Sequence, residues 1–242
     1  MARYLCHDEP ELFEFEAEVL ESRPGAVCLS RSAFYPGGGG QLPDQGTLEW
    51  SGGKTALSGF EEKGGRTWHL LAEPLELSGA VRCEIDRNFR FLMQQLHTDL
   101  HIVNALVFQA FDGALVTGVQ MSEDGSARMD FDLPDADNQK IKALEPAIND
   151  AIAQDLPVRV IYVPYHEAQN EPGLLRSKAV TPPPQADGTV RVIEIDGLDR
   201  QACGGTHLSS TGQSRPLRIR KVDNKGRHNR RVRIELVDNA AR

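Results

Sequence analysis

Long apolar runs and cysteines are scarce in this chain of 242 residues. No segment has the roughly 18 uninterrupted apolar residues of a membrane-spanning helix, and the first residues lack the basic start and apolar run of a signal peptide. Four cysteines in so long a chain do not make a disulfide framework, so we expect reduced thiols. These absences exclude a membrane protein and a small disulfide-stabilised secreted scaffold. We therefore expect a cytoplasmic protein. An apolar content of 40% is ample for a real core, and the length suffices for one large domain or two ordinary ones.

Positive charge is also scarce, except in one segment. The net charge is -8, yet residues 215–233 contain nine Lys or Arg against one acid, Asp223, which leaves -16 on the remainder. An acidic body with one basic flank can bind a phosphate backbone locally and repel it elsewhere. The alternative is a solvated strand edge, where basic side chains prevent pairing with other chains. The charge pattern is therefore compatible with nucleic acid as a partner and does not require it.

Alternating apolar and polar residues dominate the first third of the chain. Phe15, Ala17 and Val19 alternate with glutamates, and residues 81–85 repeat the same period of two, which is typical of half-buried strands. Turn-forming pairs follow one another closely, as in a small barrel, at Pro24-Gly25, Gly52-Gly53 and Gly64-Gly65. We therefore predict a separate small β-barrel module over residues 1–86.

Residues 87–242 combine helical and strand patterns. Apolar residues at three- and four-residue steps predict a helix that Asp86 caps and that runs to Ala110, before Gly113. A second helix, capped by Asp135 or Asp137, should present Ile141, Leu144, Ile148 and Ile152 and end before Pro157. We also predict strands over residues 115–121, 127–133, 158–163, 190–195 and 231–237, and a loop with Pro172-Gly173 and Pro182 to Pro184. The predicted fold class is α+β, with helices against a mostly antiparallel sheet.

Two segments far apart in the sequence contain metal-binding residue types. His97 and His101 stand at i and i+4 on one face of the predicted helix, and Cys203 and His207 enclose two glycines. Taken separately, these residues have ordinary interpretations as packed histidines or a small buried cysteine. Taken together, one thiolate and three imidazoles predict a Zn²⁺ site. A zinc peptidase is disfavoured because Thr98 stands where that motif needs glutamate, and a classical zinc finger is disfavoured by the long spacing.

A glycine-rich segment over residues 34–41 is a second candidate site. Its four consecutive glycines allow positive φ angles, and their N–H groups can approach an anion or a carbonyl closely. The alternative is a flexible connection between two strands. The flanking residues Phe34, Tyr35 and Gln41 support the hypothesis of a recognition loop.

Several segments together resemble the editing domain of alanyl-tRNA synthetase. They are His97-Thr98-Asp99-Leu100-His101, the segment Gly118–Phe131 that ends Arg128-Met129-Asp130-Phe131, Cys203-Gly204-Gly205-Thr206-His207, and Lys221–Leu236 with Lys225-Gly226-Arg227 and Arg230-Arg231-Val232-Arg233. Tyr35–Gln41, with Asp44 and Gly46 after it, resembles the glycine-rich loop of the larger freestanding alanyl-tRNA editing hydrolases. The resemblance covers about Phe13–Val237 and favours the freestanding form. Threonyl-tRNA synthetase editing regions have a similar metal pattern but usually carry proline where this chain has Thr206.

The resemblance implies an α/β two-layer editing domain after the barrel, and hydrolysis of the ester between a wrong amino acid, chiefly serine with glycine as a second candidate, and the 3′ end of alanine tRNA. Such a second site is needed because a synthetase pocket rejects poorly a near-isostere that only adds a hydroxyl. His97, His101, Cys203 and His207 would hold Zn²⁺. Four protein ligands describe a closed structural site, whereas Lewis-acid catalysis needs an open position. One ligand is weak, or the ion becomes five-coordinate, or zinc mainly positions the substrate; we favour positioning with polarisation.

The resemblance also suggests roles for other residues. Thr98, Thr117 and Gln120 are candidates to hydrogen-bond a serine hydroxyl, although each threonine can equally bond its own backbone. Members of the family often have a small or polar residue where this chain has Asp99-Leu100. Gly37, Gly38, Gly39 and Gly40 with Gln41 would close over the site, and Arg218, Lys221, Lys225, Arg227, Arg230 and Arg231 would contact phosphates of the acceptor end.

Three hypotheses remain open at this point. They are an editing esterase, a zinc-stabilised tRNA-binding module without turnover, and a zinc hydrolase for a small molecule. A deacylation assay with mischarged tRNA separates the first two, and insensitivity to charge reversal at Arg227, Arg230 and Arg231 would identify the third.

Overall fold

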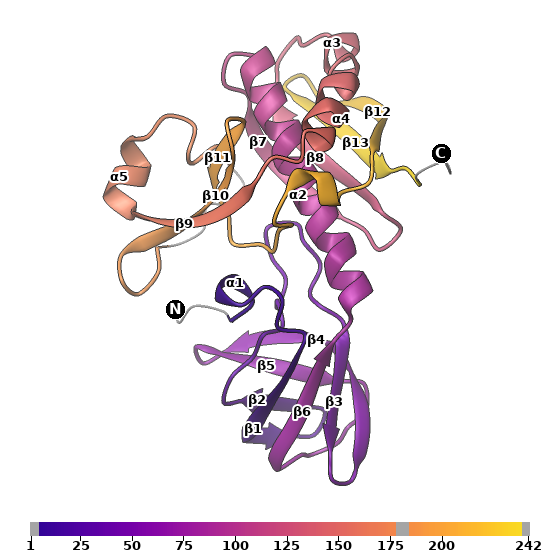
Figure 1. Cartoon of the computed structure of the whole chain (residues 1–242), viewed down its shortest axis with the longest axis vertical. Helices are drawn as coiled ribbons and strands as arrows, with labels where there is room; N and C mark the ends of the chain where they lie inside the picture. Colours follow the sequence, from indigo (N-terminus) through magenta and orange to yellow (C-terminus); the bar gives the residue numbers. More distant parts are fainter. Residues whose placement is uncertain (1–4, 178–183, 239–242) are drawn as a thin grey trace. The chain divides into compact units, whose positions relative to one another are not determined.

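The computed structural model describes residues 5–177 and 184–238 (Figure 1). The chain divides into two compact units: the first comprises residues up to Gly38 and Leu42–Phe91, and the second comprises Gly39–Gln41 and the residues from Leu92 onward. The predicted division into functional modules at residues 1–86 and 87–242 stays a prediction. None of the described helices is both long and apolar enough to cross a bilayer.

Six antiparallel strands of the first unit form a closed barrel in the order β1-β2-β5-β4-β3-β6 (Figure 1). The pairing of β1 with β6 completes the closure. The alternation in the sequence separates barrel interior from solvent, because Phe15 and Ala17 are buried while Glu16 between them is exposed. The elements are α1 (Leu5–Asp8), β1 (Glu14–Arg23), β2 (Ala26–Leu29), β3 (Gly46–Trp50), β4 (Gly53–Lys63), β5 (Arg66–Leu71) and β6 (Gly79–Ile85). The prediction of a small N-terminal barrel is confirmed.

The barrel core contains a buried histidine. Phe34 and Phe60 meet the His69 ring edge-on, with ring centroids 5.8 and 5.2 Å away. Ser32 Oγ lies 2.8 Å from His69 Nε2. Burial lowers the pKa of His69 from 6.5 to about 4, because a charged imidazolium would lose its hydration. His69 is therefore a neutral part of the core at neutral pH.

A buried ion pair in the first unit lies where the chain before the four glycines contacts the chain after them. The Asp44 carboxylate accepts the backbone N–H of Tyr35 at 2.6 Å, and the Asp44 N–H donates to the Tyr35 carbonyl at 2.9 Å. Arg90, which is fully buried, pairs with the same carboxylate and donates to the Ala33 carbonyl at 2.9 Å. Breaking either side of this pair would leave an uncompensated buried charge.

Helix α2 (Arg87–Ala110) starts and stops where the sequence indicates. Asp86 Oδ1 accepts the backbone N–H groups of Asn88 and Phe89 at 2.9 and 3.0 Å, which is an N-cap. After the helix, Gly113 has a φ of 96° and donates its N–H to the Phe108 carbonyl, as expected for a glycine stop. The predicted helix is confirmed together with both of its signals.

Two antiparallel sheets belong to the second unit, one with the order β12-β13-β8-β7 and one with the order β11-β10-β9 (Figure 1). Helices α3 and α4 pack against the edge strand β12. On α4, Asn149 exchanges hydrogen bonds with the Leu217 backbone, and Glu145 accepts the Ile219 N–H, which satisfies part of that edge. The strands are β7 (Leu115–Met121), β8 (Ser126–Asp132), β9 (Val158–Pro164), β10 (Thr189–Ile195), β11 (Asp199–Ala202), β12 (Leu217–Lys225) and β13 (Asn229–Leu236). The predicted α+β class is confirmed.

Two local predictions need correction, and one of two proposed helix caps is now identified. The second helix is two helices, α3 (Asn138–Lys142) and α4 (Glu145–Ala153), because Pro146 has no N–H for a helix interior and fits only a first turn. Asp137, and not Asp135, caps α3. Part of the expected loop is a short helix, α5 (Tyr165–Asn170), and β11 and β12 have no counterpart in the sequence-based prediction. Of the predicted loop prolines, Pro182 and Pro183 lie outside the described residues.

Candidate metal centre

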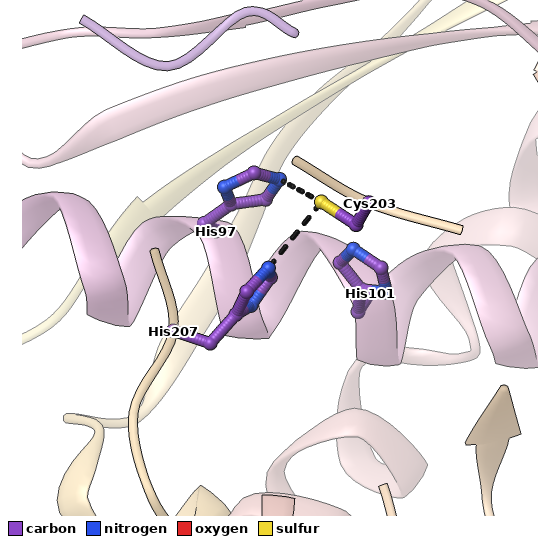
Figure 2. Close-up of side chains that lie close together, drawn as sticks. All are labelled: His97, His101, Cys203 and His207. Atoms are coloured by element: carbon purple, nitrogen blue, oxygen red, sulfur yellow. Dashed lines mark hydrogen bonds between the residues drawn. The ribbon is translucent and has the colours of Figure 1, made fainter. Parts of the chain in front are cut away.

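His97, His101, Cys203 and His207 lie together in the second unit. All are buried, and their candidate ligand atoms lie within 4.8 Å of one another. Cys203 Sγ is 3.3 Å from His97 Nε2 and 3.4 Å from His207 Nε2. Figure 2 shows two histidines rising from helix α2 and the cysteine and the third histidine coming from loop segments, with their side chains converging on one place. The predicted cluster is therefore present as a group that can hold a metal ion.

Each imidazole of the cluster also contacts a polar group through its other ring nitrogen. His97 Nδ1 is 2.8 Å from Gln41 Oε1, an acceptor, so Nδ1 carries the hydrogen. His101 Nδ1 likewise donates to Asp199 Oδ2 at 3.0 Å. His207 Nδ1 lies 3.4 Å from the hydroxyl of Thr98. For His97 and His101, a hydrogen on Nδ1 leaves the lone pair on Nε2, which is the arrangement that a metal-binding histidine requires.

The turn between Cys203 and His207 is shaped by close approach. A Cβ atom on Gly205 would lie 2.1 Å from His97 Cε1 and 2.7 Å from Gln41 Oε1, so only glycine fits there. Gly205 N–H donates to Cys203 Sγ at 3.4 Å. Arg191 of β10 is buried, and its Nη1 donates to the carbonyls of Cys203 and Gly205 at 2.8 and 2.9 Å. These contacts present the sulfur atom to the histidines.

The electrostatics of the cluster favour a cation. Burial opposes charge on Cys203, but His97 and His207 outweigh it and hold the pKa of the thiol well below its usual range. Burial likewise lowers the pKa of His207 well below 6.5. Burial also acts against a charged His101, yet its hydrogen bonds to Asp199 and Cys203 raise its pKa to about 9. Binding of a metal ion would displace the extra proton of His101 and leave a thiolate with neutral imidazoles, which is a donor set that suits the ion.

Gln41 contacts His97 of the cluster, and its predicted role as a site residue stays a prediction. It is 3% exposed and belongs to the second unit with Gly39 and Gly40. Besides contacting His97, its Oε1 accepts the Thr206 N–H at 3.0 Å, and its Nε2 donates to Thr206 Oγ1 at 2.8 Å. The amide of Gln41 therefore links a histidine on α2 to the turn after Cys203.

The four glycines of the loop all have positive φ angles, which confirms their conformational role. Gly40 also approaches β7 closely, since a Cβ atom there would lie 2.5 Å from the Val119 carbonyl oxygen. Gly39 has open space around its Cβ position, and the Gly38 carbonyl accepts the Tyr35 hydroxyl at 3.0 Å. Whether Gly37, Gly38, Gly39 and Gly40 bind substrate stays a prediction.

The remaining candidate catalytic residues differ in their surroundings. Thr98 is buried, and its hydroxyl accepts the Leu208 N–H at 3.1 Å besides lying near His207. Thr117 is half-buried at a β-bulge of β7 and donates to Asn229 at 3.4 Å. Gln120 is exposed and accepts from Arg128 at 3.0 Å. Of these three, only Thr98 contacts a ligand of the cluster.

The predicted phosphate-binding residues fall into two groups. Arg230 is 6% exposed and donates to the Ala136 carbonyl at 3.3 Å, and Arg231 forms two hydrogen bonds of 2.7 Å with Asp130. Arg218, Lys221, Lys225 and Arg227 are exposed on β12 and the turn after it. Among the described residues, Lys225 and Arg227 have no acidic partner within salt-bridge distance, whereas Lys221 pairs with Asp223 at 2.7 Å.

Asp199, Arg176 and Arg191 were missed by the sequence-based prediction. Asp199 follows Asp196 and Gly197, so its carboxylate looks like an ordinary turn residue. The arginines stand among strand and loop residues without any motif. Asp99 and Leu100, where this chain differs from many members of the family, are both fully buried. The Asp99 carboxylate accepts a hydrogen bond from the Ser214 hydroxyl at 2.9 Å. The hydrogen bond of Asp99 is therefore made to a neighbouring loop residue.

Comparison with known proteins agrees with this arrangement. Residues 190–233, which include Cys203 and His207, match the model of the threonyl and alanyl tRNA synthetase second additional domain. The chain is 34% identical to the alanyl-tRNA editing protein AlaX-M of Methanosarcina mazei over 240 residues, which are 95% of this chain and 94% of that protein. It is 34% identical to the AlaX-M protein of Saccharolobus solfataricus over 224 residues, 90% of this chain and 92% of the relative.

Alanine–tRNA ligases are also similar over part of their length. The ligase of Korarchaeum cryptofilum is 31% identical over 220 residues, which are 90% of this chain and only 24% of the ligase. The barrel, the antiparallel sheets and the Cys/His cluster thus define a protein of the synthetase-editing class. Within that class, the chain belongs to the family of alanyl-tRNA editing proteins, whose members it matches almost from end to end.

Proposed function

We propose that the protein is a zinc-dependent trans-editing hydrolase that deacylates alanine tRNA carrying serine, with glycine as a second substrate. Membership of the alanyl-tRNA editing family supports the reaction class. The observation that carries the proposal for this chain is the convergence of a thiolate and three imidazoles with their Nε2 atoms directed inward. The proposal places the protein in the cytoplasm, where its tRNA partner is used in translation.

The donor set fits Zn²⁺, which prefers sulfur and imidazole nitrogen in a tetrahedral arrangement. When bound, the ion would supply positive charge that orients and polarises the aminoacyl ester. Cys203, His97, His101 and His207 would hold it, and Gln41, Asp199 and Thr98 would fix the three rings through their Nδ1 atoms. Full coordination by protein atoms favours positioning with polarisation as the role of the ion.

Recognition of the amino acid is proposed for polar groups around the cluster. Thr98 has its hydroxyl engaged by Leu208 and lies against His207, so its first role is to orient that ring. Thr117 and Gln120 remain candidates for contact with a serine hydroxyl, and Gly37–Gly40 for contact with the terminal nucleoside. The exposed cations Arg218, Lys221, Lys225 and Arg227 would contact acceptor-end phosphates, which position the tRNA without reading its sequence.

The test is deacylation of a panel of mischarged tRNAs, with metal content measured on the same samples. Wild-type protein should release serine from alanine tRNA, and Cys203→Ala should lose both metal and activity. Cys28→Ala is the matched control, because Cys28 is a buried thiol of the barrel and should leave metal content and turnover unchanged. Binding of the tRNA by wild-type protein without any loss of the ester would replace the proposal with a binding module.

The proposed binding of phosphates needs a separate test. Charge reversal of Lys225 and Arg227 to glutamate should raise KM for the tRNA and reduce the salt dependence of binding by about one unit of slope for each phosphate that the variant no longer neutralises. Glu62→Lys, an exposed charge reversal on the barrel, is a control. If charge reversal of Lys225 and Arg227 left the activity unchanged, and if the activity did not depend on salt concentration, the protein would instead be a small-molecule hydrolase.

A further inference from the structure

A chain of buried contacts leads from His101 to an arginine that lies beyond the metal ligands. His101 Nδ1 donates to Asp199 Oδ2 at 3.0 Å, and Arg176 Nη2 lies 2.7 Å from Asp199 Oδ1. The Asp199 side chain is fully buried, and that of Arg176 is 10% exposed. The two carboxylate oxygens therefore serve two different partners, one on each side.

Arg176 is itself held in place from two directions. Its Nε donates to the Gly173 carbonyl at 2.5 Å, and its guanidinium lies over the Phe108 ring of α2 at 4.3 Å. Gly173 has a φ of 82°, and a Cβ atom there would lie 3.3 Å from both Arg176 Nε and Phe108 Cζ. The glycine of the Pro172-Gly173 turn thus leaves room for the stacked guanidinium. This contact gives the turn a structural role, which the proposed enzymatic function does not assign to it.

The contacts fix the direction of the Asp199 carboxylate. A buried carboxylate held by one hydrogen bond can rotate about its terminal torsion, whereas the hydrogen bond on Oδ2 and the ion pair with Arg176 on Oδ1 together hold Asp199 in one orientation. The orientation held here aims Oδ2 at His101 Nδ1–H and leaves His101 Nε2 free for the cluster. A lysine could supply the same charge. Its single ammonium, however, cannot contact Asp199 and the Gly173 carbonyl at once, and it has no planar group to stack on Phe108.

We infer that Arg176 is a positioning residue of the metal centre, acting through Asp199 to set the tautomer and orientation of His101. The inference rests on the proposed function in one respect, namely that the cluster binds a cation. On this inference, Arg176 controls how tightly the protein retains the metal, and it does not contact the substrate.

A double-mutant cycle on metal affinity tests the inference. Co²⁺ is titrated into metal-free wild type, Arg176→Met, Asp199→Asn and the double variant, and its thiolate absorption band is followed in competition with a chelator. Asp199→Asn should bind about 10–100-fold more weakly, and Arg176→Met about tenfold more weakly, which are typical losses for groups that orient metal ligands. The double variant should bind no more weakly than Asp199→Asn alone, because Arg176 acts through the missing carboxylate.

The control is Arg200→Met, which removes the ion pairs with Glu171 and Glu194 and leaves the ion pair of Asp199 with Arg176 in place. It should bind Co²⁺ as the wild type does. If Arg176→Met does not fold, Arg176→Lys in both backgrounds provides the same cycle, with an intermediate loss expected in the single variant. The inference would be overturned if the losses of Co²⁺ affinity in the two single variants multiplied in the double variant, or if Arg176→Met bound Co²⁺ as tightly as wild type. Failure of wild-type protein to bind Co²⁺ would instead remove the proposed metal site itself.

Discussion

Replacing Gly205 by alanine should destroy the proposed metal centre while leaving the barrel intact. The new Cβ atom would lie 2.1 Å from His97 Cε1 and 2.2 Å from its Nδ1. Ordinary contact begins near 3.4 Å, so the ring would have to retreat by 1.3 Å. Metal–ligand distances tolerate only about 0.2 Å. His97 therefore cannot remain a ligand, and we expect affinity for the ion to fall by more than about 100-fold, beyond the loss of an orienting group.

The neighbouring glycine offers a matched control. A Cβ atom on Gly204 meets no heavy atom within 4 Å, and neither glycine has a positive φ, so Gly204→Ala should behave as wild type. Both variants are titrated with Zn²⁺ against a chromophoric chelator and assayed for deacylation. Equal affinity in Gly205→Ala and wild type, or an equal loss in both variants, would refute the steric argument.

Three further outcomes follow from particular contacts. Gln41→Ala leaves the His97 Nδ1–H and the Thr206 N–H without their acceptor, so metal affinity should fall about 10–100-fold, and unchanged affinity would contradict the role of the amide. Burial lowers the pKa of His69 to about 4, so its contribution to the free energy of unfolding is fully present above pH 6.5. That contribution is lost as the pH falls from 6.5 towards 4, by about 3 kcal/mol in total. His69→Gln should remove that pH dependence in urea titrations followed by tryptophan fluorescence, which reports on the barrel because both tryptophans lie in β3 and β5. Gly46→Ala would place a Cβ atom 2.2 Å from the Glu84 carbonyl oxygen, and the same fluorescence should show a lower Tm by several degrees.

Local signals account for most of the fold that was predicted. The alternation of Phe15, Ala17 and Val19 indicated a half-buried strand because side chains point to opposite faces at successive residues. Asp86 and Gly113 marked the ends of α2 because capping depends on neighbouring backbone groups only. The break between α3 and α4 was also readable in principle, since Pro146 belongs in a first turn, but the apolar period of the second helix concealed it.

The sequence predicted the four side chains of the candidate site, but it did not predict the groups that orient them. His97 and His101 share a helix face by spacing alone, and the Cys203–His207 turn is a compact motif. Which groups hold the rings depends on the packing of β11, which places Asp199 against His101, and of the segment after α5, which places Arg176 against Asp199. The fate of the basic residues depended on packing in the same way, since Arg230 is buried while Arg227 in the turn before it is exposed.

The sequence by itself determined the first and last strands of the barrel, the long helix and the two short motifs that supply the four clustered side chains, because those features depend on periodicity and on residues close together in the chain. Only the tertiary structure decided that Gln41, Asp199 and Thr98 orient the three imidazoles, and that Gly205 must lack a side chain. The physical reason is that a hydrogen bond or a steric contact between distant segments depends on where their backbones pass each other, and the spacing of residues along a chain does not contain that information.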